Sequence, residues 1–384
     1  MPPDSVRSAP VDSARSGAEA ARSAADSVRT IRRPAEWDTV ATGLPEEARL
    51  CYAAGFRYNR VDGPAPTLGL CVERGENPRP ILLIAYTHAF SRERGLFEAR
   101  IDEDFGGRPL VALGGRVYRR TASEDEWIVG EMENTLFALF ARTDYRDYYE
   151  AEGGRAHVAL NPGRDVGLRL EAWTEEQRPL RTRTRVSAFG NEDRFRPNPP
   201  VARGKDRGWR ATARIGPEVL PVRGGTKGEV SWERSGDPLT SDFDYGRLRA
   251  SAHTLQRLGP RLDLRARALL GSTREGALPP QTVWYLGGIG TLRGHEFKEF
   301  AGDQFFLLNA EQYCRIRKRS LFVFAFLDCG AAWFGSGNWD RQRPALDGGV
   351  GIRLGEGPLS LHVARDLRDG AAPVLCGVRL GGSF

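Results

Sequence analysis

The residues in this sequence best placed to act together chemically are an arginine in a glycine-rich segment and two carboxylates that follow it. Residues 286–311 read LGGIGTLRGHEFKEFAGDQFFLLNAE, so Arg293 comes shortly after three glycines. Glycine permits tight backbone turns, and a guanidinium group offers five donors in a planar fork that suits a carboxylate. Glu311 and Asp328 are the candidate partners. We predict a loop that folds back into the lumen of a β-barrel and is pinned there by Arg293.

The sequence contains no comparable pattern for enzymatic catalysis. The sequence has no Gly-x-Ser-x-Gly elbow, and its five histidines lack the H-E-x-x-H spacing. None of the five cysteines forms a C-x-x-C pair, so no zinc or redox motif is indicated. A disulfide between distant strands is kept as an alternative. We predict no catalytic, cofactor or metal site and expect His157 and His253 to be polar residues facing the lumen. An outer-membrane barrel enzyme is kept as a second alternative.

Composition bounds the class of protein. The chain has 384 residues, 40% of them hydrophobic, and a net charge of +6, with a mean hydropathy of −0.45. No run of about 18 apolar residues occurs, which excludes a membrane-spanning helix. The absence of such a run does not argue against a membrane β-barrel, because strands that alternate apolar and polar residues average to mild hydropathy. The arginine excess fits either codon bias or a basic lumen. The arginines are spread along many strands, which argues against a nucleic-acid partner.

The dominant hydrophobic period beyond residue 50 is two. In 261–270, for example, Leu262 and Leu264 alternate with Arg261 and Arg265. Strict alternation with charges on one face indicates strands with one wet side. A soluble β-sandwich would also alternate, but its polar faces would rarely carry arginine this densely. Expected strands lie near 66–74, 80–90, 95–104, 109–120, 155–160, 165–173, 207–217, 226–235, 243–257, 261–270, 302–316, 319–333, 346–354, 357–366 and 373–384.

Two segments interrupt this period. Residues 121–152 place Leu136, Leu139 and Phe140 at a helical spacing, which predicts a helix-bearing loop packed on the end of the barrel, with an amphipathic surface helix as the alternative. Residues 177–205 are rich in proline and arginine and are expected to form a long loop, with room for one strand.

The two ends of the chain differ in character. Residues 1–48 are polar and predict a linker, a short helix or disorder, and they contain no apolar signal-peptide core. A start without a signal implies either a longer precursor or a mature or truncated form. Residues 49–384 form the predicted barrel domain. The last segment alternates up to Phe384, and a terminal aromatic residue is the assembly signal of bacterial outer-membrane barrels.

Five ordered motifs near the end of the chain carry a family resemblance. They are Gly287-Gly288 with Leu292-Arg293-Gly294, Gly302-Asp303 with Asn309-Ala310-Glu311, Phe326 to Gly330, Gly349 to Arg353, and Phe384. With them, the chain resembles the bacterial surface-antigen barrel of the outer-membrane assembly-factor superfamily, the family of BamA, TamA and the two-partner secretion transporters. The resemblance is specific from about residue 280 onward, and Tyr58 to Gly63 also resembles the barrel entry of some members.

The resemblance implies an all-β, transmembrane antiparallel barrel of about sixteen strands in the outer membrane of a Gram-negative-type bacterium. It implies a loop motif of Leu292, Arg293, Gly294 and Phe297, with Glu311 and Asp328 as lumen partners of the arginine. It also implies a weakly paired seam between the first strand, near 66–74, and the last, 373–384. Unfolded outer-membrane or secreted proteins would then be inserted or translocated through that seam.

The sequence departs from the family pattern in two places that bear on this expected function. His295 stands where an aromatic residue usually follows Arg-Gly, which affects the packing of the loop tip. Periplasmic polypeptide-binding domains are absent ahead of the barrel, so a separate periplasmic module is a candidate partner beside membrane lipid. A passive outer-membrane pore or anchor is the alternative function.

Overall fold

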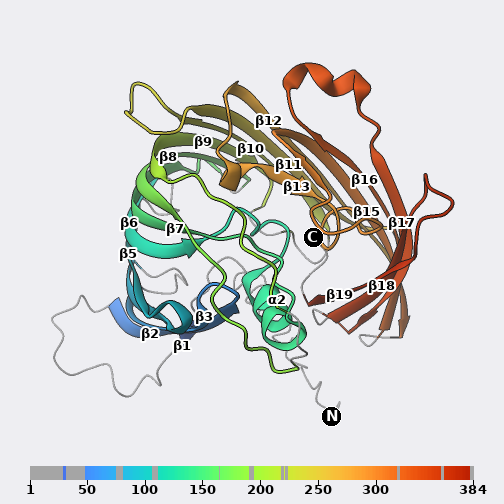
Figure 1. Cartoon of the computed structure of the whole chain (residues 1–384), viewed down its shortest axis with the longest axis horizontal. Coiled ribbons are helices and arrows are strands. Elements are labelled where there is room, and N and C mark those ends of the chain that lie inside the picture. The colour runs from blue at the N-terminus through green and yellow to red at the C-terminus, as the bar shows by residue number, and fades with distance from the viewer. Residues whose placement is uncertain are drawn as a thin grey trace, which may run out of the picture.

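The fold is a single large antiparallel sheet that curls into a barrel-shaped wall (Figure 1). The computed structural model describes residues 29–31, 48–74, 81–105, 111–163, 165–189, 194–217, 220, 224–317, 321–355 and 359–380. The sheet contains seventeen strands, of which the first has three residues and the other sixteen are longer. They are β1 (Arg29–Ile31), β2 (Ala48–Asn59), β3 (Gly63–Arg74), β4 (Leu82–Ala89), β5 (Arg94–Phe105), β6 (Val111–Ala122), β7 (Tyr149–Leu160), β8 (Val166–Pro179), β9 (Gly204–Ile215), β10 (Gly225–Ser235), β11 (Tyr245–Arg257), β12 (Leu262–Gly276), β15 (Gln304–Arg317), β16 (Leu321–Trp333), β17 (Ala345–Leu354), β18 (Leu359–Asp366) and β19 (Leu375–Leu380).

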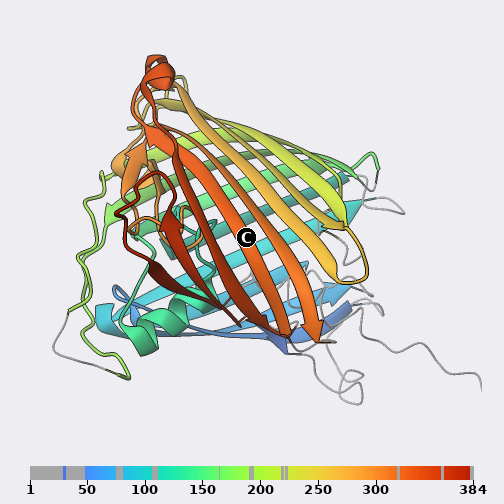
Figure 2. The ribbon, with the colours of Figure 1, turned by 90° about the vertical axis from the view of Figure 1, so that its right-hand side faces the viewer.

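Each strand pairs with the next in sequence, from β1–β2 to β18–β19, by antiparallel register. The strands are tilted and lie side by side (Figure 2). In the described residues, β19 pairs with β18, and β2 pairs with β3 on one edge and with the short strand β1 on the other, at residues 52–54. No register between β19 and β2 is found among these residues. We call this junction between β2 and β19 the seam.

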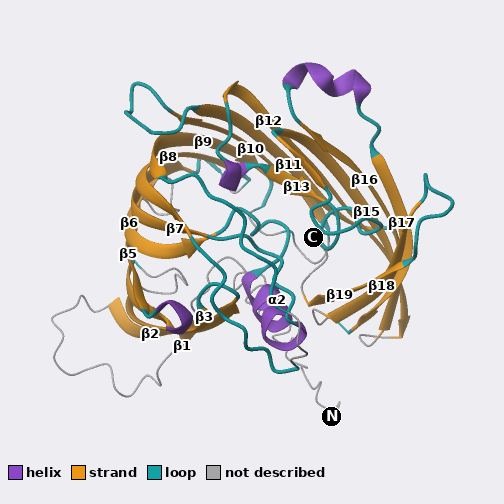
Figure 3. Cartoon of the chain, in the orientation of Figure 1, coloured by secondary structure: helices purple, strands orange, loops and turns teal. Residues whose placement is uncertain are grey.

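Helices are short and lie between strands (Figure 3). They are η2 (Phe90–Arg92), α2 (Glu131–Leu136), η3 (Phe137–Ala141), η4 (Pro280–Thr282) and η5 (Ser336–Arg341). A second, two-stranded sheet, β13 (Trp284–Leu286) and β14 (Phe300–Gly302), lies in the connection between β12 and β15. No helix in the described part of the chain is long and apolar enough to span a membrane.

The two faces of the wall differ as the alternation predicts. On β8, Leu168 and Leu170 are exposed outside, whereas Glu171 and Glu175 are buried inside. Inside the wall the arginines are paired: Arg155 contacts Glu171 at 3.2 Å and Glu175 at 3.0 Å. The arginines on the inner face therefore form ion pairs in the lumen, where carboxylates offset their positive charge.

The position of the first long strand corrects one expectation. The sequence predicted that the strand near 66–74 borders the seam, but that strand is β3, and β2 precedes it. Arg49 and Arg57 share the inward face of Cys51 and Ala53, but the positions between the two arginines on that face are small and uncharged, so the charge alternation used to detect strands is weak in β2. Residues 58–63 consequently form the end of β2, the turn at residues 60–62 and the first residue of β3.

The two interrupting segments were predicted more accurately. Residues 121–152 contain α2 and η3 between β6 and β7, as expected for a helix-bearing loop. The described residues between β8 and β9 contain no strand. Cys51 and Cys71 form a disulfide between the neighbouring strands β2 and β3. In the predicted linker 1–48, only Arg29–Ile31 and Ala48 are described, and the rest of that prediction lies outside the described residues.

The exposed apolar face of β8 leads to a first prediction. Leu170 is 49% exposed on the outer wall, so Leu170→Arg would place a charge against lipid at a cost of about 2–4 kcal/mol near the bilayer midplane. We expect slower and less complete folding into lipid vesicles, measured by the mobility of unheated protein on gels. Leu170→Ala is the control for lost side-chain volume. Equal folding of the two variants would contradict a lipid-facing wall.

Candidate functional site

The loop between β12 and β15 returns on itself through the short β13–β14 pair. Tyr285 pairs with Ala301, and the segment between the two strands holds the Arg-Gly motif. Gly290 has φ 78°, a left-handed conformation, and a Cβ atom there would lie 2.3 Å from the carbonyl oxygen of Ile128. Only glycine suits both the backbone angle and this close approach. The glycine run thus lets the loop pack against the connection that carries α2.

Arg293 binds both carboxylates proposed for it. Its Nε and Nη2 donate to the two oxygens of Asp328, each at 2.7 Å, and its Nη1 donates to Glu311 Oε1 at 2.6 Å. The guanidinium also stacks 3.5 Å from the centroid of the Phe326 ring. Only 7% of the Arg293 side chain is exposed, and Asp328 is fully buried. Two-pronged binding of one carboxylate fixes the arginine in orientation as well as position.

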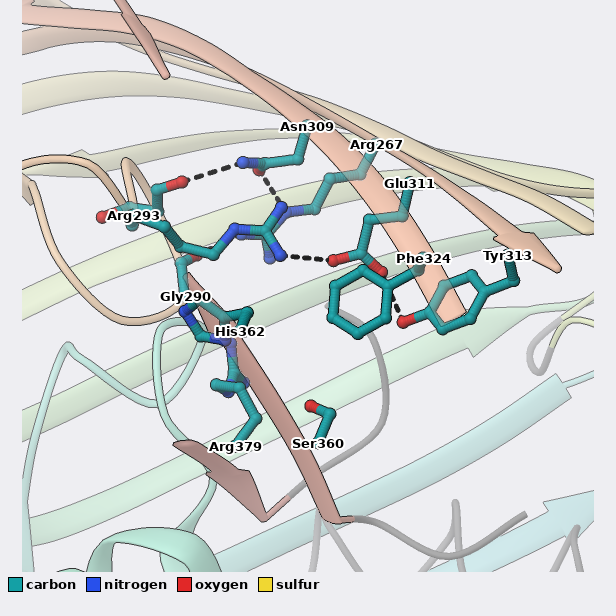
Figure 4. Close-up of a pocket in the computed structure, with 11 residues that line it drawn as sticks. Arg267, Gly290, Arg293, Asn309, Glu311, Tyr313, Phe324, Ser360, His362 and Arg379 are labelled. Carbon is teal, nitrogen blue, oxygen red and sulfur yellow. Dashed lines mark hydrogen bonds and ion pairs between the residues drawn. The ribbon is translucent and has the colours of Figure 1, made fainter. Parts of the chain in front are cut away.

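Side chains from the wall complete this cluster. Asn309 donates to Asp328 Oδ1 at 2.7 Å and to the Thr291 carbonyl at 2.8 Å, so one side chain ties strand to loop. Arg267 donates to Asn309 Oδ1 at 2.8 Å. The Glu311 carboxylate lies between Arg293 and the hydroxyl of Tyr313, which donates to it at 2.8 Å (Figure 4). The charged groups are therefore hydrogen-bonded on several sides, as buried charges require.

The other predicted loop residues contact different surroundings. Leu292 is fully buried in an apolar cluster with Trp284, Leu286, Phe305 and Leu307. Gly294 donates its N–H to Asp347 Oδ2 at 2.7 Å. The Phe297 ring packs edge-on against Tyr145, with centroids 5.1 Å apart, and therefore joins the loop to the residues after α2.

Lys298 adds a charged contact between loops. Its Nζ donates to Asp125 at 2.7 Å and also to Asp147. Burial and the nearby Asp147 raise the pKa of Asp125, with Lys298 opposing them. Burial would also raise the pKa of Asp147, but the positive charges of Lys298, Arg196 and Arg60 outweigh it and hold that pKa below its usual value. One lysine thus joins two loop carboxylates of different acidity.

The helix α2 contacts both strands that border the seam. Glu133 accepts from Arg379 Nε of β19 at 2.9 Å and from the backbone N–H of Leu380 at 2.7 Å. On the other side, the backbone N–H of Tyr58 in β2 donates to Thr135 Oγ1 at 3.2 Å. Figure 1 shows α2 between the two ends of the sheet. Side chains of this helix therefore satisfy a backbone donor on each border strand.

The segment that carries α2 is itself anchored. Asn134 donates to Asp144 at 3.0 Å and to the Tyr148 hydroxyl at 2.9 Å, and its oxygen accepts from the N–H of Tyr145. Ala138 of η3 is buried with Tyr58 and Phe195 in a small apolar cluster. The helix is held to β2 by packing and to β19 by the ion pair of Glu133.

Sequence reasoning named the arginine and its two carboxylates but missed the residues at the seam. Glu133 and Thr135 lie in a segment whose helical period was recognised, yet nothing in the local sequence indicates which strands that helix contacts. Phe384, predicted to be the assembly signal, lies outside the described residues.

The class of fold is therefore an antiparallel barrel wall with an inward loop held by a buried arginine. Scans against protein-family models and curated protein sequences find no match. Among solved structures, the chain is similar to BamA from Haemophilus ducreyi lacking POTRA domains 1–3, with a TM-score of 0.56 and 12% identity over 87% of this chain and 69% of that one. This likeness confirms the predicted fold.

Two CdiB structures are also similar. The chain matches CdiB from Acinetobacter baumannii with a TM-score of 0.47 and 12% identity, covering 92% of this chain and 64% of that one. For CdiB from Escherichia coli the TM-score is 0.47 and the identity 13%, covering 88% of this chain and 63% of that one. The chain thus spans less than two-thirds of either CdiB.

The Arg293 cluster generates a second prediction. Arg293→Ala leaves Asp328 and Glu311 buried without their cation, which costs on the order of 3–5 kcal/mol. We expect unfolding at lower denaturant concentration and loss of heat resistance in detergent. Arg293→Lys keeps the charge but loses the planar fork, so its stability should lie between the two. Unchanged stability of Arg293→Ala would contradict the pinning role.

Proposed function

We propose that this chain is an outer-membrane barrel that helps other polypeptides insert into, or cross, the outer membrane through the seam between β2 and β19. The proposal combines the family resemblance of the sequence with the fold shared with BamA. It concerns the activity, the membrane and the clients, none of which follows from fold alone.

The observation that carries this proposal is the state of the two border strands. In the described residues, no register joins β2 and β19, and β1 covers the outer edge of β2 only at residues 52–54. The helix α2 contacts a backbone donor on each of the two strands, beyond the segment paired with β1. Unpaired backbone groups are costly in hydrocarbon, so a border strand released from α2 favours a new strand as its partner. A client segment of β character could provide one. The contacts of α2 would then compete with the client.

The passive pore remains the alternative, and the interior of the barrel gives it less support. The inward loop is bound on several sides within the lumen. Arg293 binds a carboxylate of the wall strand β16, and Lys298 and Phe297 contact residues of the neighbouring loop that carries α2. Such cross-connections favour a filled lumen and a lateral route over an open axial one.

The third prediction tests the seam directly. The background is a variant in which Cys314, Cys329 and Cys376 are replaced by serine. Glu133→Cys and Arg379→Cys are introduced into it, and a reducible bifunctional thiol reagent then links α2 to β19. The cross-linked protein in lipid vesicles should lose its ability to speed the folding of a urea-diluted outer-membrane barrel. We expect the uncross-linked protein to accelerate that folding by about tenfold over empty vesicles, a barrier change of about 1.4 kcal/mol.

Reduction should restore the activity of the cross-linked protein. Because reduction also opens the Cys51–Cys71 bond, the serine background treated with reductant is the matched control. Each single-cysteine variant treated with the reagent controls for modification alone. Full activity in the cross-linked state would exclude the seam as the route, and no acceleration by any form would favour the pore or anchor.

A further inference from the structure

A second polar cluster lies beside the Arg293 site and has too few positive charges for its carboxylates. Asp328, Asp347 and Asp366 are directly opposite one another across β16, β17 and β18. Like charges placed opposite across strands destabilise a sheet unless a cation intervenes. Arg293 binds Asp328. In the part of the chain that the structure describes, the ion-pair partner of both Asp347 and Asp366 is His295.

The atoms of this cluster face one another at short range. His295 Nε2 lies 3.3 Å from Asp347 Oδ1 and 3.9 Å from Asp366 Oδ2. One ligand atom from each residue falls within 4.8 Å of the other two. Ligands of a single first-row divalent ion, bound at about 2.0–2.2 Å, have separations of roughly this size. The geometry thus suits three ligands around one ion.

The hydrogen bonding at the cluster points to a missing cation. Asp347 is fully buried, its Oδ2 accepts from Gly294, and its Oδ1 has no hydrogen-bond partner. His295 Nε2, which lies 3.3 Å from this oxygen, is also buried and makes no hydrogen bond within the described residues. Leaving such polar atoms unsatisfied in the interior is costly. A cation between the nitrogen and the oxygens would satisfy both.

Glu299 orients the histidine. Its Oε2 lies 3.3 Å from His295 Nδ1, on the side of the ring away from the two aspartates. A carboxylate on Nδ1 keeps the proton there and directs the Nε2 lone pair to the opposite side, the arrangement found behind metal-bound histidines. Gly294 makes the approach possible, because a Cβ atom at that position would lie 2.6 Å from the backbone nitrogen of Asp366.

We propose that His295, Asp347 and Asp366 bind a divalent first-row metal ion that fastens the tip of the inward loop to β17 and β18. One imidazole and two carboxylates suit Zn²⁺ or Mn²⁺, whereas Mg²⁺ and Ca²⁺ prefer oxygen ligands alone. Such a site would give the histidine, which replaces the usual aromatic residue after Arg-Gly, a role of its own. It would exist whatever the barrel transports.

The fourth prediction is a titration of the full, chelator-treated protein in detergent with Zn²⁺, followed by competition with a chromophoric chelator. We expect one saturable Zn²⁺ site, little binding of Mg²⁺, and at least about tenfold weaker binding of Zn²⁺ by Glu299→Gln, which alters only the orienting carboxylate. His295→Phe, which restores the motif's aromatic residue, and Asp366→Asn should abolish the site.

His157→Gln is the matched control, because His157 also lies near a carboxylate, at 3.6 Å from Asp102, but belongs to no such trio among the residues that the structure describes. It should bind Zn²⁺ as the unmodified protein does. Heat resistance measured in the same samples keeps the test valid if a variant folds poorly, because Asp366 is partly exposed and its replacement should be tolerated. No saturable Zn²⁺ site, or equal binding by His295→Phe, would overturn the proposal.

Discussion

The binding of Arg293 to Asp328 and Glu311 is the contact on which the interior of this barrel depends. It fixes the connection between β12 and β15, residues 277–303, against the strands β15 and β16. Once that loop is in place, Phe297 and Lys298 have neighbours in the loop that carries α2. The position of α2 at the seam is thus connected, through loop contacts, to the same arginine.

This connection relates stability to function. A buried ion pair contributes little net stability compared with an apolar replacement, but it is severely disrupted when one partner is lost. Such a contact favours one arrangement of the loops over other arrangements. A seam whose border strands are both contacted by α2, and where β2 is paired with β1 over only three residues, is a surface that would be released without breaking the other strand pairs. Stability would then come from the seventeen paired strands and control from the loops.

The sequence predicted the wall and the arginine cluster because both depend on local signals. Period-two alternation shows which residues face inward, and the Arg-Gly motif with Glu311 and Asp328 has a recognisable spacing. The strand β2 was missed because the middle of its inward face is small and uncharged, with arginines only toward its two ends. The contacts of Glu133 could not be predicted, since they depend on how a loop folds over strands that are distant in sequence. The regular spacing of Asp328, Asp347 and Asp366, 19 residues apart, was the available signal for the second polar cluster, beside the Arg293 site.

The most direct test of the account is site-specific photo-cross-linking in the native membrane, with a photoreactive residue at Phe56 on β2, which lies beyond the segment paired with β1, at Val378 on β19, or at Leu170 on the distant wall. If the seam receives client strands, the first two positions should form adducts with newly made outer-membrane or exported proteins, and Leu170 should not. Adducts at all three positions alike, or at none, would contradict a seam that pairs with clients.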